Sequence, residues 1–465
     1  MAGLPLPRPQ LITDEVGAAP LADRIPAAVQ AILGILERDG RAAWVVGGSL
    51  RDILLGRTPH DWDLATDARP EQVQALFAGA IYENAFGTVA VQRDGVAYEI
   101  TTFRRDHDYA DFRRPHRVEF GSTIEEDLAR RDFTVNALAW GAVPGASPSL
   151  VDPFGGRTDL ERRRLVAVGV PAERFGEDAL RMIRAVRLAA QLEFTIAPAT
   201  LSAITRQVEL VRHLSGERVA AELEKLLSTA RPSIGLRLME ATGLLRQVSV
   251  ELADQRGLVQ AKISGDDLWD HTLRTVDAVP LDLPVVRLAA LVHDIGKPAT
   301  AADGHFIGHD SVGAELADAL LSRLHFPRLV VERVSLLVRN HMFNYEPSWS
   351  DTAVRRLIGK LGPTVLTELL ALRQADNLGS GLPADAGELD ELRARIAEQL
   401  EARAVLDRSG LAIDGDDLIR ELGLTQGPAL GAILDRLVEV VINDPAQNDG
   451  PTLLLRAQAL LTEDR

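Results

Sequence analysis

Two aspartates, Asp61 and Asp63, lie two residues apart in the stretch HDWDLAT. The surrounding residues predict a short strand, and alternate residues of a strand point to the same face. Carboxylates held side by side repel each other, and two Mg²⁺ ions relieve that repulsion in enzymes that clamp an attacking hydroxyl and a leaving pyrophosphate. The alternative is a solvated edge strand. Glu99, on a later predicted strand, is either a third carboxylate on that face or a surface residue.

Upstream of this pair, the stretch VVGGSLRDILLG runs from an apolar strand into two glycines and then into a helix-forming segment. Gly47 and Gly48 allow the backbone to approach an anion closely, and the start of the following helix offers free N–H groups. A plain turn is the alternative for the glycines alone. Followed by the two aspartates, they favour a phosphate-binding loop beside a metal site.

A third pattern, GEDALRMIRAVR, places Asp178, Arg181, Arg184 and Arg187 at i, i+3 spacing along one ridge of a predicted helix. Spacing alone fits a solvated helix face. Asp178 is able to accept from the exocyclic amine of cytosine or adenine, while Arg181 donates to the ring acceptors. Uracil and guanine place a carbonyl oxygen at the position of that amine, so we expect them to be refused.

A second set of polar residues lies in apolar surroundings further along the chain. His293 and Asp294 end the apolar stretch RLAALVHDIGKP, and buried polar groups require partners. Other candidates are His271, His309, His341 and Asp376. Imidazole and carboxylate ligands suit a divalent metal that activates water for phosphoester hydrolysis. Any one of these histidines alone is more simply explained as a core or surface residue.

Composition narrows the class of protein. The chain has 465 residues, a net charge of −16 and no cysteine, which excludes disulfides, thiolate zinc sites and cysteine nucleophiles and predicts a cytoplasmic protein. No apolar stretch approaches the ~18–20 residues that a bilayer span needs. The acidic balance argues against nucleic-acid binding over the whole surface, although a basic region is still able to bind RNA.

The order of elements predicts an α+β protein. Strand-like runs alternate with helical patterns up to about residue 140, and helical periodicity dominates from Pro171 onward. We expect an N-terminal mixed-sheet catalytic head followed by an all-helical remainder. Turn-rich breaks divide the chain into a head over 1–150, a helical neck over 151–262, a metal-binding helical domain over 263–385 and a helical tail over 386–465.

Taken together, the motifs resemble the polymerase-β-like nucleotidyltransferases, specifically the class II branch of CCA-adding tRNA nucleotidyltransferases and bacterial poly(A) polymerases. The stretch GGSLRDILLGRTPHDWDLAT carries the resemblance, together with EITTFRRD, EEDLARRDFTVNALA, DPFGGRTDLERR and ERFGEDALRMIRAVRLA in the family order. The pattern His271, His293-Asp294, Asp376 resembles an HD phosphohydrolase domain, which some members carry after the nucleotidyltransferase half.

The resemblance implies template-independent addition of CCA to the 3′ end of tRNA from CTP and ATP. It implies that Asp61 and Asp63 are catalytic and hold Mg²⁺. The implied nucleotide contacts are Gly47, Gly48, Ser49, Arg51, Arg131, Asp178, Arg181, Arg184 and Arg187. An unidentified divalent metal is implied at His271, His293, Asp294 and Asp376, with His309 and His341 as phosphate contacts or ligands of a second metal.

The arginine-rich segment DHDYADFRRPHRVEFGS, over residues 106–122, is predicted to be a loop; by resemblance it corresponds to the flexible loop that helps the pocket change from C to A. Several alternatives stay open: an enzyme that adds only CC or A, a poly(A) polymerase, a metal-dependent phosphohydrolase whose head only docks RNA, and a tRNA-binding chaperone without catalysis. The sequence predicts no oligomeric state.

Overall fold

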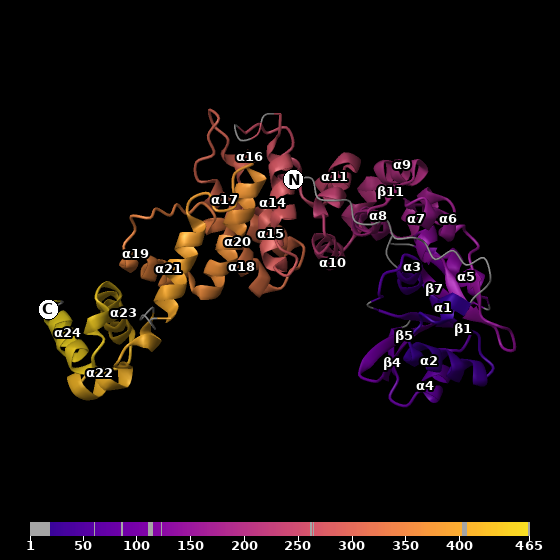
Figure 1. Cartoon of the computed structure of the whole chain (residues 1–465), viewed down its shortest axis with the longest axis horizontal. Coiled ribbons are helices and arrows are strands. Elements are labelled where there is room, and N and C mark those ends of the chain that lie inside the picture. The colour runs from indigo at the N-terminus through magenta and orange to yellow at the C-terminus, as the bar shows by residue number, and fades with distance from the viewer. Residues whose placement is uncertain are drawn as a thin grey trace. The chain divides into compact units, whose positions relative to one another are not determined.

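The computed structural model describes residues 19–59, 61–84, 87–109, 115–121, 123–260, 263, 265–401 and 407–463. The chain divides into two compact units, Met1–Val250 and Glu251–Arg465. Figure 1 shows that the strands belong to the first unit and that the second unit is built from helices. The predicted α+β class with a helical remainder is therefore confirmed. The finer division into head, neck, metal-binding domain and tail stays a prediction.

A mixed sheet forms the centre of the head. Its order is β3 (Ile81–Asn84), β4 (Thr88–Arg93), β5 (Val96–Thr102), β2 (Asp63–Thr66), β1 (Ala43–Val46), β8 (Ala139–Ala142) and β9 (Ser149–Val151). Strands β2 and β5 run parallel, and β1 is antiparallel to both β2 and β8. All four residues of β1 are buried, which explains why its sequence AWVV is apolar throughout instead of alternating.

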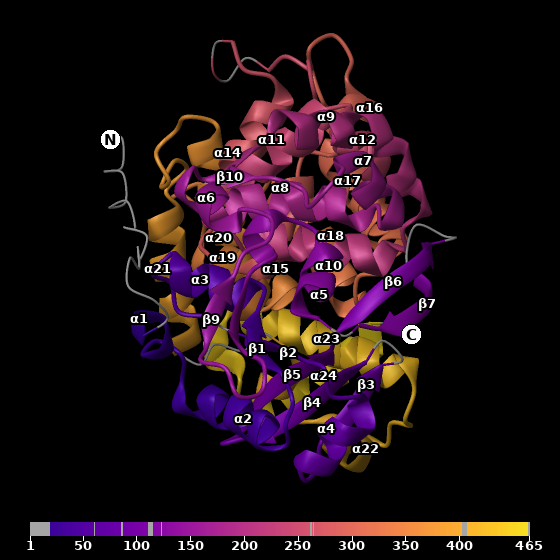
Figure 2. The same cartoon turned by 90° about the vertical axis from the view of Figure 1, so that its right-hand side faces the viewer.

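Helices cover both faces of this sheet. Figures 1 and 2 show α2 (Ala27–Arg38) and α4 (Pro70–Leu76) on one side of the strands, and α3 (Gly48–Leu54) and α5 (Ile124–Ala129) on the other. Helix α2 buries Val29, Ile32, Leu33 and Leu36, whose spacing puts them on one helical face. The first unit also contains α1 (Ala19–Ala22), the 3₁₀ turn η1 (Thr134–Asn136) and α6 (Gly156–Glu161).

The segment expected to be a loop over residues 106–122 is partly a hairpin. Strand β6 (Arg104–Tyr109) pairs antiparallel with β7 (Pro115–Phe120), and Phe120 lies under the guanidinium of Arg69 at 4.4 Å. Alternating residues such as Arg117, Val118 and Glu119 are compatible with this pairing. The expected loop is wrong for these two strands, and residues 110–114 lie outside the described part of the chain.

Helices complete the first unit. Helix α8 (Leu180–Leu192) packs against α10 (Gly216–Leu227) and α11 (Pro232–Thr242). The remaining elements are β10 (Arg164–Leu165), α7 (Pro171–Glu177), β11 (Thr195–Ile196), α9 (Pro198–Gln207), η2 (Val208–His213), α12 (Leu244–Val248) and α13 (Val250–Ala253), of which α13 crosses into the second unit. Ten of the thirteen residues of α8 are buried, so this helix is fixed from several sides.

The second unit begins with helices that surround the histidines. These are α14 (Leu268–Ala278), α15 (Pro284–Val292), α16 (Lys297–Thr300), α17 (His309–Arg323), α18 (Arg328–Asn340), α19 (Asp351–Leu361), α20 (Pro363–Gly379) and α21 (Leu389–Glu401). They are followed by η3 (Arg408–Gly410), α22 (Gly415–Leu422), α23 (Pro428–Asn443), η4 (Pro445–Gln447) and α24 (Gly450–Glu463). Helices α22, α23 and α24 share a separate apolar cluster around Leu418, Leu437 and Leu453.

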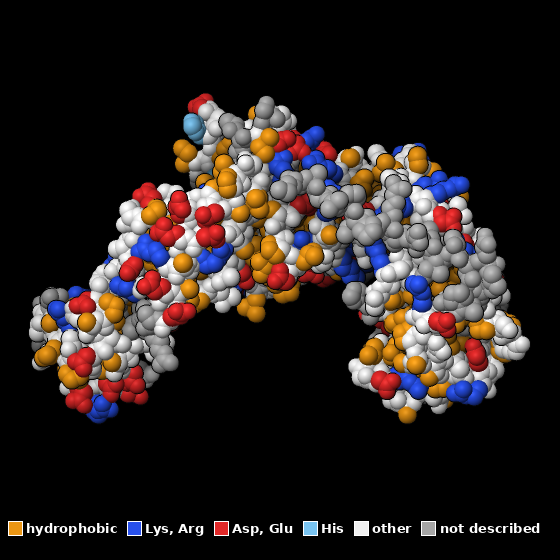
Figure 3. Space-filling view, viewed as in Figure 1, with side chains coloured by type: hydrophobic (Ala, Val, Ile, Leu, Met, Phe, Trp, Pro, Cys, Tyr) orange, Lys and Arg blue, Asp and Glu red, His pale blue; other side chains and the backbone are white. Residues whose placement is uncertain are grey.

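Charge is distributed unevenly between the units. Residues 251–465 contain 34 acidic and 21 basic side chains, so their net charge of −13 accounts for most of the −16 of the chain. In Figure 3 acidic side chains gather over α19, α21 and α22. The first unit is close to neutral and rich in arginine. No helix in the described part of the chain is both long and apolar enough to cross a bilayer.

Candidate functional sites

The paired aspartates lie at the start of strand β2. Asp63 is its first residue, and Asp61 lies two residues earlier in an exposed bend, so the prediction that both belong to one strand is wrong for Asp61. Asp63 is in register with Glu99 on the parallel strand β5, and residues in register share a sheet face. Glu99 is exposed. The sheet therefore aligns the positions of Asp63 and Glu99.

The electrostatics of Asp63 fit a cation site. Burial raises its pKa and so does the negative charge of Asp61, whereas Arg131, Arg184 and Arg51 lower it. The net direction is upward from the ordinary value, which means that the charged form of Asp63 lacks full compensation in the protein alone. A divalent cation between oxygens of Asp61 and Asp63 would supply that compensation, and carboxylate oxygens are the ligands that Mg²⁺ prefers.

Gly47 brings the loop against this carboxylate. Its φ of 72° and ψ of −136° belong to a region that only glycine occupies readily. A β-carbon here would lie 2.7 Å from Nη1 of Arg131 and 3.2 Å from Oδ2 of Asp63. Helix α3 starts at the next residue, as the glycine pair predicted. Ser49 is buried and its hydroxyl donates to the carbonyl of Val46 at 3.0 Å, which ties the start of α3 to the end of β1.

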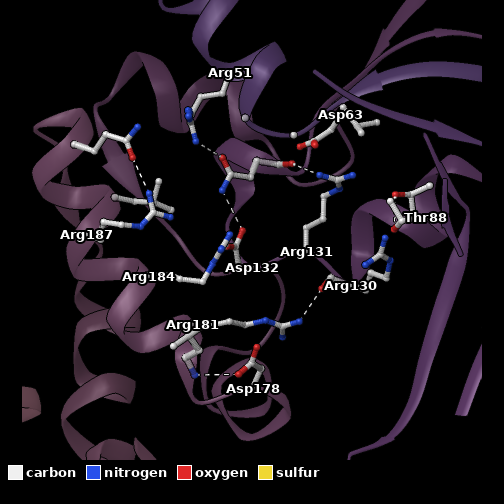
Figure 4. Close-up of a pocket in the computed structure, with 18 of the residues that line it drawn as sticks. Arg51, Asp63, Thr88, Arg130, Arg131, Asp132, Asp178, Arg181, Arg184 and Arg187 are labelled. Atoms are coloured by element: carbon white, nitrogen blue, oxygen red, sulfur yellow. Dashed lines mark hydrogen bonds and ion pairs between the residues drawn. The ribbon is translucent and has the colours of Figure 1, made fainter. Parts of the chain in front are cut away.

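A cavity of about 500 Å³ joins the head to the helices that follow it within the first unit. Figure 4 shows Asp63 and Arg131 facing it from one side and Asp178, Arg181, Arg184 and Arg187 from the other. The predicted residues that line it are Gly47, Gly48, Arg51, Asp63, Arg131, Asp178, Arg181, Arg184 and Arg187. The structure thus brings together most of the residues that the three motifs suggested separately.

Asp178 does not belong to the helix that carries the arginines. It follows the last residue of α7 in an extended conformation, and α8 starts two residues later at Leu180. The predicted single ridge from Asp178 to Arg187 is therefore wrong at its first member. The physical reason is a local hydrogen bond: Oδ1 of Asp178 accepts from the backbone N–H of Leu180 at 3.0 Å, and such a bond competes with helix formation at the aspartate.

All three arginines of α8 are held by acids of the protein. Arg184 pairs with Asp132 at 2.7 Å, and Arg187 pairs with Glu222 at 2.6 Å. The charge of Asp132 raises the pKa of Arg184, and burial lowers that of Arg187. Arg181 pairs with Glu177 and donates to the backbone carbonyl of Arg130 at 3.0 Å.

Sequence reasoning missed Asp127, which organises the arginines on the head side. It is fully buried and pairs with Arg130 at 2.6 Å and with Arg131 at 3.2 Å. Burial alone would raise its pKa, but the two guanidinium charges hold the pKa of Asp127 below the ordinary value. The signal was present in EEDLARRD, where an acid precedes two arginines by three and four residues on a helix.

The second site gathers all six predicted histidines and acids inside the second unit. Nε2 of His271 lies 3.1 Å from Nε2 of His293 and 3.2 Å from Oδ1 of Asp376, and these three residues form one potential ligand group. Asp294, His309 and His341 form the other. The residues come from α14, α17, α20 and the ends of α15 and α18. All six are buried.

Asp294 connects the two groups. Its Oδ2 lies 3.2 Å from Nε2 of His293, and its Oδ1 lies 3.4 Å from Nε2 of His309 and 3.6 Å from that of His341. Oδ1 is buried and has no hydrogen-bond partner in the described part of the chain. This oxygen and the two imidazole nitrogens that face it are ligands that a divalent metal would bind together.

Backbone carbonyls orient three of these imidazoles. Nδ1 of His293, His309 and His341 donates to the carbonyls of Ala290, Phe306 and Val338 at 2.8, 2.7 and 2.6 Å. Each Nε2 is thereby left as the inward acceptor, the form in which histidine binds metals. Burial lowers the pKa of His293, which keeps that imidazole neutral.

Lys297 and Gln260 support the second site and were missed by sequence reasoning. Lys297 donates to Oδ2 of Asp294 at 2.6 Å and to Gln260 at 2.9 Å. Burial alone would raise the pKa of Asp294, but His293 and the charge of Lys297, together with hydrogen bonds from His271 and His293, hold that pKa well below the ordinary value. Lys297 three residues after Asp294 is readable in HDIGK, whereas Gln260 has no motif.

Comparison with known families agrees with these two sites. The chain matches models of the poly A polymerase head domain over residues 43–166, of the probable RNA and SrmB-binding site of polymerase A over 193–255, and of the HD domain over 247–381. Fold and site together define a nucleotidyltransferase with a polymerase-type head and an HD domain.

The chain belongs to the family of CCA-adding enzymes, which confirms the resemblance. It is 34% identical to the CCA-adding enzyme of Levilactobacillus brevis over 91% of this chain and 95% of the relative. It is also 34% identical to that of Geobacillus kaustophilus, over 90% and 93%. The crystal structure of the Bacillus stearothermophilus CCA-adding enzyme in complex with CTP has a TM-score of 0.68 and 29% identity, covering 94% of this chain and 100% of that one.

The fold extends to more distant members. The Thermotoga maritima CCA-adding enzyme complexed with tRNA has a TM-score of 0.56 at 20% identity and covers 97% of this chain and 100% of that one. At this level of identity, the comparison bears on the fold alone.

Proposed function

We infer that the chain adds C, C and A to the 3′ end of tRNA from CTP and ATP without a nucleic-acid template. The observation that carries this inference is the single cavity that holds Asp63 on one side and Asp178 with Arg181 on the other. A nucleotide whose triphosphate lies against Gly47 and Asp63 has its base on the side of the two reading residues. Relatives that are CCA-adding enzymes, and a similar structure solved in complex with CTP, support the same conclusion.

The reaction joins the 3′ hydroxyl oxygen of the tRNA to the α-phosphorus of the nucleotide. The bond between the α-phosphorus and the bridging oxygen breaks, pyrophosphate leaves, and the hydroxyl proton passes to solvent. Asp61 and Asp63 would hold Mg²⁺, which favours loss of the hydroxyl proton and neutralises the leaving group. Arg51 and Arg131 contribute positive charge on the triphosphate side, and the backbone N–H of Gly48 is able to donate to a phosphate oxygen.

Base selection falls to Asp178 and Arg181. The carboxylate accepts from the exocyclic amine of cytosine or adenine, and the guanidinium donates to ring acceptors. A uracil or guanine carbonyl would face the carboxylate without a proton between them. Two acceptor oxygens repel each other and form no hydrogen bond, so binding of these bases is weaker. We propose that Arg184 and Arg187, both paired with acids, fix the helix and add positive charge to the cavity wall.

Incorporation assays test the transferase. The purified protein receives a tRNA that ends at the discriminator base, together with labelled CTP and ATP, and a sequencing gel resolves the products. We expect exactly three added nucleotides with wild-type protein and none with Asp61→Ala. Addition that stops after two nucleotides, or that continues into an A tract, identifies a partial or poly(A)-forming enzyme instead. Unchanged activity of Asp61→Ala would contradict the proposed metal site.

A second activity is favoured by the orphaned oxygen of Asp294. We propose that the HD site binds one or two divalent metals through His271, His293, Asp294, Asp376, His309 and His341 and hydrolyses phosphoesters. The bound metal would supply an activated water, while Lys297 holds the orientation of Asp294. Release of nitrophenol from bis(nitrophenyl) phosphate, measured across a series of divalent metals, tests this; no release with any metal contradicts it.

The absence of cysteine and the tRNA substrate favour a cytoplasmic location, which we propose for this chain. Binding to tRNA is expected to be electrostatic through the arginine-rich first unit, and therefore to weaken as salt rises. Filter binding of labelled tRNA at several salt concentrations measures this dependence.

A further inference from the structure

The carboxylate of Asp178 is fixed at both oxygens. Oδ1 accepts from the backbone N–H of Leu180 at 3.0 Å, and Oδ2 accepts from Nη2 of Arg218 at 2.7 Å. A carboxylate with a donor on each oxygen keeps one orientation, because rotation would break both bonds. Each oxygen retains a second lone pair, so the carboxylate is still able to accept from a base.

Arg218 comes from a different element and lines the same cavity. It lies in the first turn of α10, 40 residues after Asp178. A cation in the first turn of a helix opposes the helix dipole, so local helix formation does not favour arginine at this position. A residue that breaks a local preference beside a binding site is a candidate for a functional role.

Arg218 also has hydrogen-bonding capacity to spare. Its Nη1 is buried and has no hydrogen-bond partner in the described part of the chain. Its side chain is 24% exposed, and the residue belongs to the cavity wall together with Asp178 and Arg181. An unsatisfied buried donor at the wall of a binding cavity is a cost that a purely structural ion pair would not explain.

Arg181 is held by other partners. It donates to the carbonyl of Arg130 at 3.0 Å and pairs with Glu177. Figure 4 shows Arg181 and Asp178 close to each other at the same side of the cavity. The two groups proposed to read the base therefore have separate supports, and removing Arg218 should release one of them only.

We propose that Arg218 is a positioning residue that sets nucleotide selectivity by holding the Asp178 carboxylate in the orientation that accepts an exocyclic amine. The inference rests on the proposed function, in which Asp178 reads the base. With Arg218 removed, the carboxylate is free to turn away from a carbonyl oxygen, so the repulsion against uracil and guanine weakens. Cytosine and adenine lose an aligned acceptor at the same time.

Kinetic selectivity tests the proposal. We measure kcat/KM for CTP and UTP on a tRNA ending at the discriminator base, and for ATP and GTP on one ending in CC. In Arg218→Ala we expect both the CTP:UTP and the ATP:GTP ratio to fall about tenfold or more. Arg218→Lys keeps a positive charge near Asp178 and should restore part of each ratio. Arg206→Ala, which removes an exposed arginine of α9, is the matched control and should leave both ratios unchanged.

Two comparisons separate this inference from the proposed function. If Asp178→Ala keeps wild-type ratios, base reading by Asp178 is wrong, and the proposed mechanism of base selection fails with it. If Asp178→Ala loses selectivity but Arg218→Ala keeps it, only the role of Arg218 is overturned. The double variant should match Asp178→Ala alone, since Arg218 acts through Asp178.

An equal fall for all four nucleotides in Arg218→Ala would show a merely structural role and overturn the proposal. Thermal melting of each variant checks that it folds. If Arg218→Ala does not fold, a folded Arg218→Gln variant, which removes the charge, decides the question. Wild-type ratios in that variant overturn the proposal.

Discussion

Arg184 donates to a single oxygen of Asp132 from two nitrogens, Nε at 2.9 Å and Nη2 at 2.7 Å, across 52 residues of sequence. Asp132 lies in the head, between α5 and η1, and Arg184 lies in the centre of α8. The other oxygen of Asp132 accepts from Asn136, which in turn accepts from Arg51. A continuous chain of polar contacts thus runs from the first helix after the glycine loop to the helix that carries the predicted base reader.

Asp132→Asn should destabilise the first unit. The variant leaves the charge of Arg184 without its main partner, and breaking a largely buried pair in this way costs about 2–4 kcal/mol. Urea unfolding at neutral pH measures the loss. Asp390→Asn removes one side of an exposed pair with Arg393 and serves as the control, with a change below about 1 kcal/mol. A difference no larger than that of the control would show that the pair does not stabilise the fold.

The same pair gives stability a pH dependence. Burial alone would raise the pKa of Asp132, but the charge of Arg184 and hydrogen bonds from Asn136 and Arg184 hold it well below the ordinary aspartate value of 3.8. A carboxylate with a depressed pKa stabilises the folded state above its unfolded pKa, and this contribution is lost as pH falls below about 3.8. Unfolding free energies at several acidic pH values should therefore decline more steeply in wild type than in Asp132→Asn.

Asp63→Asn should abolish transfer and yet raise thermal stability without metal. We expect activity to fall by at least about 10³-fold, because the variant removes a charge that positions the cation. Burial raises the pKa of Asp63, so its charged form opposes folding at neutral pH. In EDTA the variant should melt above wild type, by a margin that shrinks as pH falls toward the raised pKa. Added Mg²⁺ should raise the melting temperature of wild type more than that of the variant; equal Mg²⁺ responses would exclude Asp63 as a ligand.

Gly47→Ala tests the contact between loop and catalytic carboxylate. The new β-carbon would lie 2.7 Å from Nη1 of Arg131, which must move, and we expect kcat/KM for CTP to fall about 10²-fold. Gly56→Ala is a matched control, since Gly56 has a φ of 71° but nothing within 4 Å of an added β-carbon. Both substitutions place alanine at a positive φ, which strains the backbone, so thermal melting of each variant is measured beside its kinetics. Equal kinetics in both would mean that the loop does not position Arg131.

His293→Ala should remove metal from the HD site without affecting CCA addition. The imidazole faces both Asp294 and His271, so we expect metal content to drop by about one ion or more per chain. Elemental analysis of dialysed protein measures this, alongside phosphodiester hydrolysis and the sequencing gel. His305→Ala, an exposed histidine, is the control. If metal content stays at the wild-type level in His293→Ala, the ion is bound elsewhere.

Structural elements that depend on nearby residues could be predicted from the sequence. The glycine loop, its strand and its helix occur where expected, because apolar runs and glycines determine them locally. The six predicted HD residues lie together in the structure, because a His-Asp pair inside an apolar stretch requires partners wherever it lies. The comparisons with known proteins confirm the predicted family, and the structure confirms the predicted fold class. The roles of individual site residues stay predictions.

Pairings between distant segments could not be read. Nothing near Arg184 indicates that Asp132 will hold it, and nothing near Arg187 indicates Glu222. The start of α8 was misplaced because aspartate is compatible both with a helix and with the position before one, and only the bond to Leu180 decides. These contacts depend on how α8 and α10 pack, which helical periodicity alone does not specify.

The boundary near residue 250 separates the two chemistries. Every residue proposed to contact a nucleotide precedes it, and every candidate HD ligand follows it. A lineage that loses His293 therefore keeps an intact transferase, and selection is free to retain, alter or discard the hydrolase without touching tRNA maturation. Natural variation at the six HD positions is consequently expected to be independent of variation in the nucleotide cavity.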